Sequence, residues 1–271
     1  MFHELWLIPL GFAVGAYGTL IGAGGGFVLM PVLLLIFPDQ SPELLTSISL
    51  AVVFCNAASG SASYARMKRI DYKSALIFAA ATVPGAILGA ITVKYVSRGP
   101  FDAAFGVLLT AGAIFLLWQT FRPMTPRIYG PRHTSTRTIT ESDGTSHTYS
   151  FDPRLGILIS LVVGFASSIL GIGGGIIHVP ALVRLLDFPV HIATATSHLI
   201  LAVTALTATV VHVAQGTFSQ DILEMIYLAV GVVAGAPLGA YLSRKIHGRW
   251  IIRGLAIALA CVGIRLLIQN I

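Results

Sequence analysis

Two glycine blocks are the residues whose type and spacing point most directly to chemistry. The first reads Gly22-Ala-Gly-Gly-Gly26 and is followed by Pro31; the second reads Gly171-Ile-Gly-Gly-Gly175 and is followed by Pro180. Both lie inside long apolar stretches, and glycine favours helix poorly, so each block predicts a break in a helix. A helix that starts after such a break directs free N–H groups and its dipole at the break, which suits an anion. We therefore expect a backbone site for a small anion at Gly22, Gly24, Gly25, Gly26, Gly171, Gly173, Gly174 and Gly175.

A simpler interpretation is that the glycines only let membrane helices pack closely. The duplication favours the ligand site, because the two blocks are 149 residues apart and each is followed by proline at the same distance. Neither block has the spacing of a dinucleotide-binding fingerprint or of a phosphate-binding loop.

Polar side chains inside the apolar stretches are the second set of candidates. Hydroxyl and amide groups can donate hydrogen bonds to an oxyanion, and the candidates are Ser47, Ser49, Asn56, Thr196, Ser197 and His198. Histidines in the same regions could carry a coupled proton, and these are His178, His198 and His212. The alternative is structural, because serine and threonine often bond to carbonyls of their own helix.

The positions of the acidic residues indicate which kinds of ion site the chain can form. All 11 lie in loops or at the ends of apolar stretches. A relay for protons or sodium ions built on buried carboxylates therefore has no candidate, and neither has a carboxylate metal site. We expect no metal and no cofactor, and an anion rather than a cation as substrate.

The composition indicates the class of protein in which these residues are placed. Of 271 residues, 55% are hydrophobic and 10% are charged, with a mean hydropathy of +0.85. Soluble domains carry about 25% charged residues, so the chain is predicted to be an all-α polytopic membrane protein. A soluble enzyme, a nucleic-acid binder and a disordered scaffold are disfavoured. Cys55 and Cys261 lie in apolar stretches and predict reduced thiols, and no cleaved signal peptide is expected.

The apolar stretches set the domain organisation. They span 5–37, 44–65, 74–96, 101–121, 155–186, 192–213, 222–243 and 250–268, which predicts about 8–10 membrane segments. Residues 122–153 are polar and predict a mobile cytoplasmic linker. It separates a transmembrane repeat at 1–121 from a second at 154–271.

The duplication extends beyond the glycines, because Val83-Pro-Gly-Ala-Ile-Leu-Gly-Ala90 matches Val233-Ala-Gly-Ala-Pro-Leu-Gly-Ala240. Residues 5–37 are too long for one span and too short for two, so a glycine-broken helix or a re-entrant hairpin is expected at the start of each repeat. With both ends of that stretch on one side, the repeats are inverted and 14 of the 17 basic residues share a side. The positive-inside rule favours this arrangement over a split of 10 to 7, with both termini outside.

The quoted blocks, together with Thr46-Ser-Ile-Ser-Leu50 and Thr196-Ser197-His198-Leu199, resemble the TauE/SafE family of membrane permeases, often called sulfite exporters. The resemblance covers roughly 11–121 and 155–268. It implies transport of small sulfur-containing anions such as sulfite, sulfoacetate or related sulfonates.

The expected function is that of a secondary transporter, an exporter, that works by alternating access in a bacterial inner membrane. Its expected partners are the small anion and the lipid bilayer, with no nucleic acid. The sequence does not decide whether the protein forms a homodimer. An anion channel of the same fold is the main alternative. A membrane-embedded enzyme needs a nucleophile or metal cluster that the sequence does not offer, and a membrane scaffold or chaperone is the remaining alternative.

Overall fold

The computed structural model describes residues 5–121, 135–217 and 222–243, together with residues 260, 263, 264 and 268. Its elements are α1 (Leu7–Ile21), α2 (Gly26–Ile36), α3 (Pro42–Arg66), α4 (Tyr72–Thr92), a 3-10 turn (Val93–Tyr95), α5 (Arg98–Phe121), β1 (Ser135–Thr140), β2 (Ser146–Phe151), α6 (Pro153–Leu170), α7 (Gly175–Leu185), α8 (Val190–Ala214) and α9 (Ile222–Leu242). Most of the expected stretch 250–268, including Cys261, and residues 122–134 of the expected linker lie outside the described residues.

Five helical segments of the described chain are long and apolar enough to cross a membrane: Pro42–Arg66, Tyr72–Tyr95, Pro153–Leu170, Val190–Ala214 and Leu223–Leu242. Three further apolar helices, α1, α2 and α7, are shorter than the roughly 20 residues that a full crossing needs. The prediction of a polytopic membrane protein is confirmed, but the chain is mostly helical rather than all-α, because it also contains the paired strands β1 and β2.

The chain forms two compact units. The larger contains residues 1–94 and 129–244, and the smaller contains residues 95–128 and 245–271. In the smaller unit, α5 begins with an ion pair in which Arg98 Nε lies 2.9 Å from the Asp102 carboxylate. One turn further, the rings of Phe101 and Phe105 stack with centroids 6.0 Å apart.

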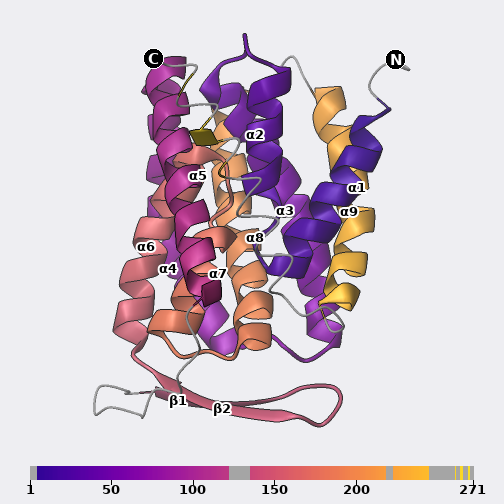
Figure 1. The fold of residues 1–271 in the computed structure, drawn as a ribbon, viewed down its shortest axis with the longest axis vertical. Coiled ribbons are helices and arrows are strands. Elements are labelled where there is room, and N and C mark those ends of the chain that lie inside the picture. The colour runs from indigo at the N-terminus through magenta and orange to yellow at the C-terminus, as the bar shows by residue number, and fades with distance from the viewer. Residues whose placement is uncertain are drawn as a thin grey trace. The chain divides into compact units, whose positions relative to one another are not determined.

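The helices of the larger unit pair across the two halves of the sequence. Helix α1 lies along α9 and α4 along α6, while α3 packs against α8 (Figure 1). A Cβ on Gly235 of α9 would stand 2.2 Å from the carbonyl oxygen of Phe12 in α1. One on Gly85 of α4 would stand 2.3 Å from the carbonyl oxygen of Leu161 in α6. Small residues therefore bring these backbones together, as in other membrane helix pairs.

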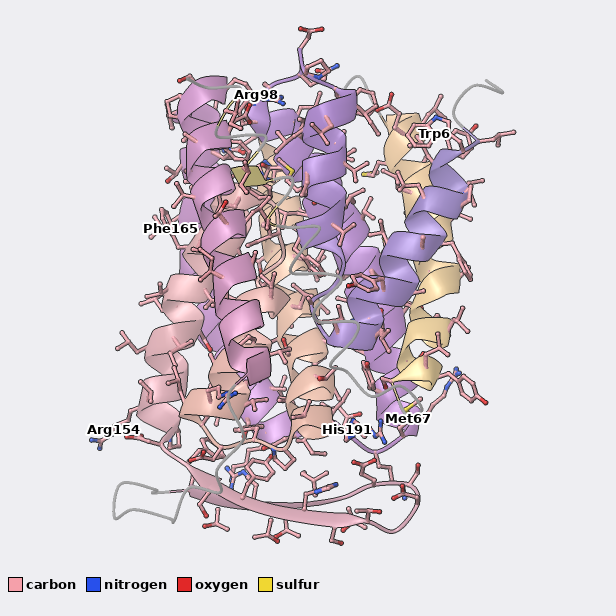
Figure 2. All side chains as sticks on the ribbon, viewed as in Figure 1. Trp6, Met67, Arg98, Arg154, Phe165 and His191 are labelled. Carbon is pink, nitrogen blue, oxygen red and sulfur yellow. The ribbon has the colours of Figure 1, made fainter. Side chains whose placement is uncertain are left out.

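The helices that begin each half start at opposite ends of the larger unit. Trp6, which precedes α1, lies at one end, and Arg154, in the first turn of α6, lies at the other (Figure 2). Met67, after α3, and His191, in the first turn of α8, lie at the same end as Arg154 (Figure 2). Strands β1 and β2 also lie across this end, which we call the hairpin end (Figure 1).

The expectation of a mobile linker at 122–153 is wrong for its last part, which forms an antiparallel hairpin of β1 and β2. The turn between the strands contains Gly144 with a positive φ of 88°. Polar residues of both strands face solvent, while Tyr149 and Phe151 are buried. An isolated hairpin is marginally stable, so its order depends on docking to the helices, which the local composition does not reveal.

The hairpin docks through charges and aromatic rings. Arg69 Nε lies 2.5 Å from the Glu141 carboxylate, and both side chains are buried. The Tyr149 hydroxyl donates to the Asp71 carboxylate at 2.8 Å. Burial, together with the neighbouring Asp71 carboxylate, raises the pKa of Tyr149 above its ordinary value, so the phenol keeps the proton that it donates. The ring of Phe188, just before α8, lies against Tyr149 with centroids 4.5 Å apart.

Candidate functional site

Each glycine block forms a sharp corner between two helices. Gly22 ends α1 with φ +84°, and Gly25 precedes α2 with φ +80°. Gly171 ends α6 with φ +69°, and Gly174 precedes α7 with φ +77°. These left-handed conformations are ones that side chains other than glycine rarely adopt, which explains why the sequence places glycine there.

The two corners touch one another although they are far apart in the sequence. A Cβ on Gly26 would stand 2.7 Å from the Ile172 carbonyl oxygen, and one on Gly175 would stand 2.6 Å from Ala23 Cα. The glycines therefore allow two backbones to meet where α2 and α7 begin. The structure brings together the two halves of the site expected from the sequence.

The central helices α3 and α8 cover this junction with apolar side chains. The Val53 side chain of α3 lies 2.6 Å from where a Cβ on Gly173 would stand. The Leu201 side chain of α8 lies 2.1 Å from where a Cβ on Gly24 would stand. Both side chains are buried. The junction is therefore closed to solvent in this conformation.

Two predicted ligands, Ser49 and Ser197, each reach across to the glycine block of the other half. Ser49 in α3 donates to the Gly171 carbonyl oxygen at 2.6 Å, and Ser197 in α8 donates to the Gly22 carbonyl oxygen at 3.5 Å. Both hydroxyls satisfy a carbonyl left free at a helix end. In this conformation they hold the corners in place.

Beside the first corner, Asn56 and His198 meet at a residue that the sequence analysis missed. Thr19 Oγ1 donates to Asn56 Oδ1 at 3.1 Å and lies 3.3 Å from His198 Nε2. Tyr64, also missed, donates its hydroxyl to the Thr19 carbonyl oxygen at 2.7 Å and packs its ring edge against His198. All four side chains are buried. They join α1, α3 and α8, and only the spatial proximity of these helices could have indicated the cluster.

Two further predicted ligands have structural partners. The Thr196 hydroxyl accepts the Asp71 backbone N–H at 3.1 Å, which links α8 to the start of α4 and so to the docked hairpin. Ser47 donates to the Leu44 carbonyl oxygen of its own helix at 2.7 Å. Neither side chain is hydrogen-bonded to the glycine junction.

The candidate histidines lie in three different settings. His178 in α7 has Nε2 3.2 Å from the Ser160 hydroxyl of α6, and His198 belongs to the Thr19 cluster. His212 near the end of α8 is buried, and neither ring nitrogen has a hydrogen-bond partner within the described chain. The three side chains are not gathered around one group.

Several buried hydroxyls lack a partner, and they lie near the second corner. Thr46, Ser167 and Ser168 are each fully buried, and their hydroxyl oxygens make no hydrogen bond within the described part of the chain. The sequence analysis did not name the two serines as candidates. Their position directly before the second glycine block was the signal that could have found them.

An apolar cavity of about 480 Å³ lies between α3 and α9, lined by residues that include Phe54, Cys55, Met225 and Val233. Its apolar lining gives an anion no hydrogen-bond donors. In the described residues, no group of three His, Cys, Asp or Glu side chains could hold a metal ion. The glycine junction therefore stays the candidate anion site predicted from the sequence.

Comparisons with known proteins agree with this architecture. The probable membrane transporter protein YunE of Bacillus subtilis (strain 168) is 33% identical over 272 residues, which cover 98% of this chain and 97% of that protein. A probable membrane transporter protein of Methanocaldococcus jannaschii is 26% identical over 98% of both chains. Another, from Xylella fastidiosa (strain Temecula1), is 26% identical over 88% of this chain and 82% of its own. No solved structure matches the chain.

The family model described as sulfite exporter TauE/SafE matches residues 7–266. This range includes both glycine corners and every helix of the larger unit. The chain therefore belongs to the TauE/SafE family, and it is a multi-pass membrane transporter rather than an enzyme.

Proposed function

We propose that the protein is a secondary transporter that exports small sulfur-containing anions such as sulfite or sulfoacetate. The observation that carries this proposal is the meeting of two glycine corners, each of which starts a helix, inside a bundle of membrane helices. Free N–H groups and two helix dipoles converge there without any acidic side chain. The name of the family model, sulfite exporter, supports the substrate class.

The transporter consists of two inverted repeats, each of which begins with a re-entrant helical hairpin. Support comes from Trp6 and Arg154, which precede or begin equivalent helices and lie at opposite ends of the larger unit (Figure 2). The pairing of α1 with α9 and of α4 with α6 has the twofold pattern that such repeats produce.

The hairpin end faces the cytoplasm of a bacterial cell, and both termini face outward. Basic residues gather in the segments at this end, namely Arg66, Lys68, Arg69, Lys73, Arg137, Arg154 and Arg184. Lysine and arginine are enriched in cytoplasmic loops of membrane proteins. A negative cell interior favours anion efflux by about 2.3 kcal/mol per charge for each 100 mV.

Transport proceeds by alternating access to the glycine junction, which is closed in the present conformation. Because α1 contacts α9 and α4 contacts α6 through their backbones, the bodies that move contain helices from both repeats. The hydrogen bonds of Ser49 and Ser197 across the junction rearrange when one side opens.

Counterflow tests the proposal. Proteoliposomes that contain the purified full chain are preloaded with unlabelled sulfite, and uptake of labelled sulfite is measured with sulfoacetate, thiosulfate and sulfate as competitors. A carrier gives saturable, transient accumulation of label, and the order of competition defines the substrate class. A channel of the same fold gives flux without accumulation. Absence of any flux in vesicles that contain folded protein would overturn the substrate assignment.

A further inference from the structure

We propose that the two glycine corners bind the anion unequally, and that the hydroxyl of Ser167 is a direct ligand at the second corner. The inference rests on the proposed function and deepens it. It assigns the oxyanion head of a sulfite or sulfonate to the N-terminus of α7, where Ser167 and the first backbone amides of the helix donate hydrogen bonds.

The position of Ser167 supports this role. Its side chain is fully buried, and its hydroxyl oxygen lies 3.1 Å from where a Cβ on Gly174 would stand. Gly174 is the residue that precedes α7, an apolar helix of 11 residues. The hydroxyl therefore lies beside the first turn of a helix whose positive dipole end is buried.

The hydroxyl of Ser167 is also unused by the protein. It has no hydrogen-bond partner among the residues that the structure describes. Serine and threonine in a membrane helix usually bond to the carbonyl four residues earlier, as Ser63, Thr204 and Thr207 do here. A buried hydroxyl without a partner is unfavourable, so a ligand that accepts a hydrogen bond from it would remove a cost already present in the protein.

The backbone supplies further donors. The N–H groups of Ile177 and His178 bond to the Gly174 carbonyl oxygen, whereas those of Gly174, Gly175 and Ile176 have no acceptor within the described chain. An oxyanion with three oxygens can accept bonds from several such groups at once. The Val163 side chain lies 2.9 Å from where a Cβ on Gly174 would stand, so the site suits a compact oxyanion group such as that of sulfite or a sulfonate.

The first corner differs at the equivalent position. Gly18 stands 149 residues before Ser167 and offers no hydroxyl. Its carbonyl oxygen accepts the N–H groups of Ala23 and Gly24, at 2.9 and 3.1 Å. The Ser167 carbonyl oxygen accepts those of Gly171 and Ile172, so the N–H of Gly173 has no acceptor within the described chain whereas that of Gly24 has one. Among the described residues the second corner therefore has one more free backbone N–H, and the Ser167 hydroxyl beside the start of its helix, while the unpartnered donor beside the first corner is the Nδ2 group of Asn56.

Ser168 provides a matched control. It is equally buried and its hydroxyl is also without a partner in the described chain, but its Cβ lies 3.0 Å from the Cβ position of Gly89 in α4. It therefore faces a helix interface and not the start of α7. Replacing either serine with alanine removes the same atom from neighbouring positions of one helix.

The test measures sulfite-dependent thermal stabilisation of the purified full chain in detergent, and sulfite counterflow, for Ser167→Ala, Ser167→Cys and Ser168→Ala. We expect Ser167→Ala to weaken the apparent affinity for sulfite about tenfold or more, the loss typical of one hydrogen bond to a charged group. Ser167→Cys, which keeps the size but donates weakly, should lose nearly as much. Ser168→Ala should stay within about twofold of the wild type.

Wild-type affinity in Ser167→Ala, or an equal loss in Ser168→Ala, would overturn the assignment of Ser167 while leaving the transporter in place. If the wild type itself responds to none of sulfite, sulfoacetate and thiosulfate in either assay, the proposed function fails and the inference fails with it. Should Ser167→Ala unfold, Ser167→Cys decides the question, because its side chain fills the same space.

Discussion

The two glycine corners have almost the same backbone and very different surroundings. Their three left-handed glycines have φ values of 84°, 74° and 80° in the first block and 69°, 78° and 77° in the second. The first corner is bordered by the bonded cluster of Thr19, Asn56, Tyr64 and His198, whereas hydroxyls near the second have no partner within the described residues. Glycine fixes the shape of both corners. The Thr19 hydroxyl beside the first corner is hydrogen-bonded, although Nδ2 of Asn56 and Nδ1 of His198 are not, whereas the Ser167 and Ser168 hydroxyls beside the second have no partner in the described chain.

The difference between the two corners is also seen when equivalent residues of the two repeats are compared. Thr19 corresponds to Ser168 at an offset of 149 residues, and Tyr64 corresponds to His212 at an offset of 148. Thr19 and Tyr64 are hydrogen-bonded to each other's helix, while Ser168 and His212 have no hydrogen bond in the described chain. The hairpin docks on both halves, through Arg69 just after α3 and through Phe188 just before α8. At this repeat position the hydroxyl is therefore hydrogen-bonded in the first half and without a partner among the described residues in the second.

The largest effect is expected for Gly174→Val, which should abolish sulfite counterflow while the protein still inserts into the membrane. A valine there needs a positive φ, which costs about 1–2 kcal/mol, and its Cβ would meet Val163 at 2.9 Å. Gly216→Val is the control, because Gly216 has φ +76° but no atom of the described residues lies within 4 Å of its Cβ position. Equal flux in both variants would show that the corner does not bind substrate.

The next largest effect concerns the ion pair that docks the hairpin to the segment after α3. Glu141→Gln leaves the buried Arg69 guanidinium without its carboxylate, so we expect the docked state to lose about 3 kcal/mol. Hydrogen exchange of the amides in 135–151 measures this loss directly. Asp102→Asn removes the carboxylate of a more exposed pair on α5 and should cost only about 0.5 kcal/mol of stability. Unchanged exchange in Glu141→Gln would mean that the aromatic contacts alone hold the hairpin.

A smaller effect is expected when Thr19, in the hydrogen-bonded cluster, and Ser168, its counterpart in the second half, are each substituted. Thr19→Val removes the group that Asn56 and His198 share, and we expect a loss of about 1–2 kcal/mol of stability. Ser168→Ala, at the equivalent position, should change stability by less than about 0.5 kcal/mol, because its hydroxyl has no partner to lose in the described part of the chain. Thermal unfolding in detergent without substrate gives both values. A larger loss for Ser168→Ala would reverse the assignment of the two halves.

The smallest expected effect separates the two hydroxyls that cross the junction. Ser49 bonds to the Gly171 carbonyl at 2.6 Å, and Ser197 bonds to the Gly22 carbonyl at the long distance of 3.5 Å. Ser49→Ala should therefore cost about 1 kcal/mol of stability and Ser197→Ala less than half of that, again by thermal unfolding. Equal losses would show that the two bonds are equivalent in the membrane.

The sequence by itself determined the class of protein and the position of both corners. Apolar stretches of about 20 residues leave a helix no environment other than a membrane, and a run of glycines breaks a helix wherever it occurs, so both features are local. Prediction was weakest for the linker, because the buried face of the hairpin consists of a few residues such as Tyr149 and Phe151 that need a docking surface.

Only the tertiary structure decided which polar groups have partners. Ser49 and Gly171 are 122 residues apart, and Thr196 and Asp71 are 125 apart, so no spacing in the sequence predicts that they bond. The same packing leaves the Ser167 hydroxyl, beside Gly174, without a partner among the residues that the structure describes. The physical reason is that a hydrogen bond depends on the direction and distance of two groups in space, which are set only after α1, α3, α6 and α8 have packed together.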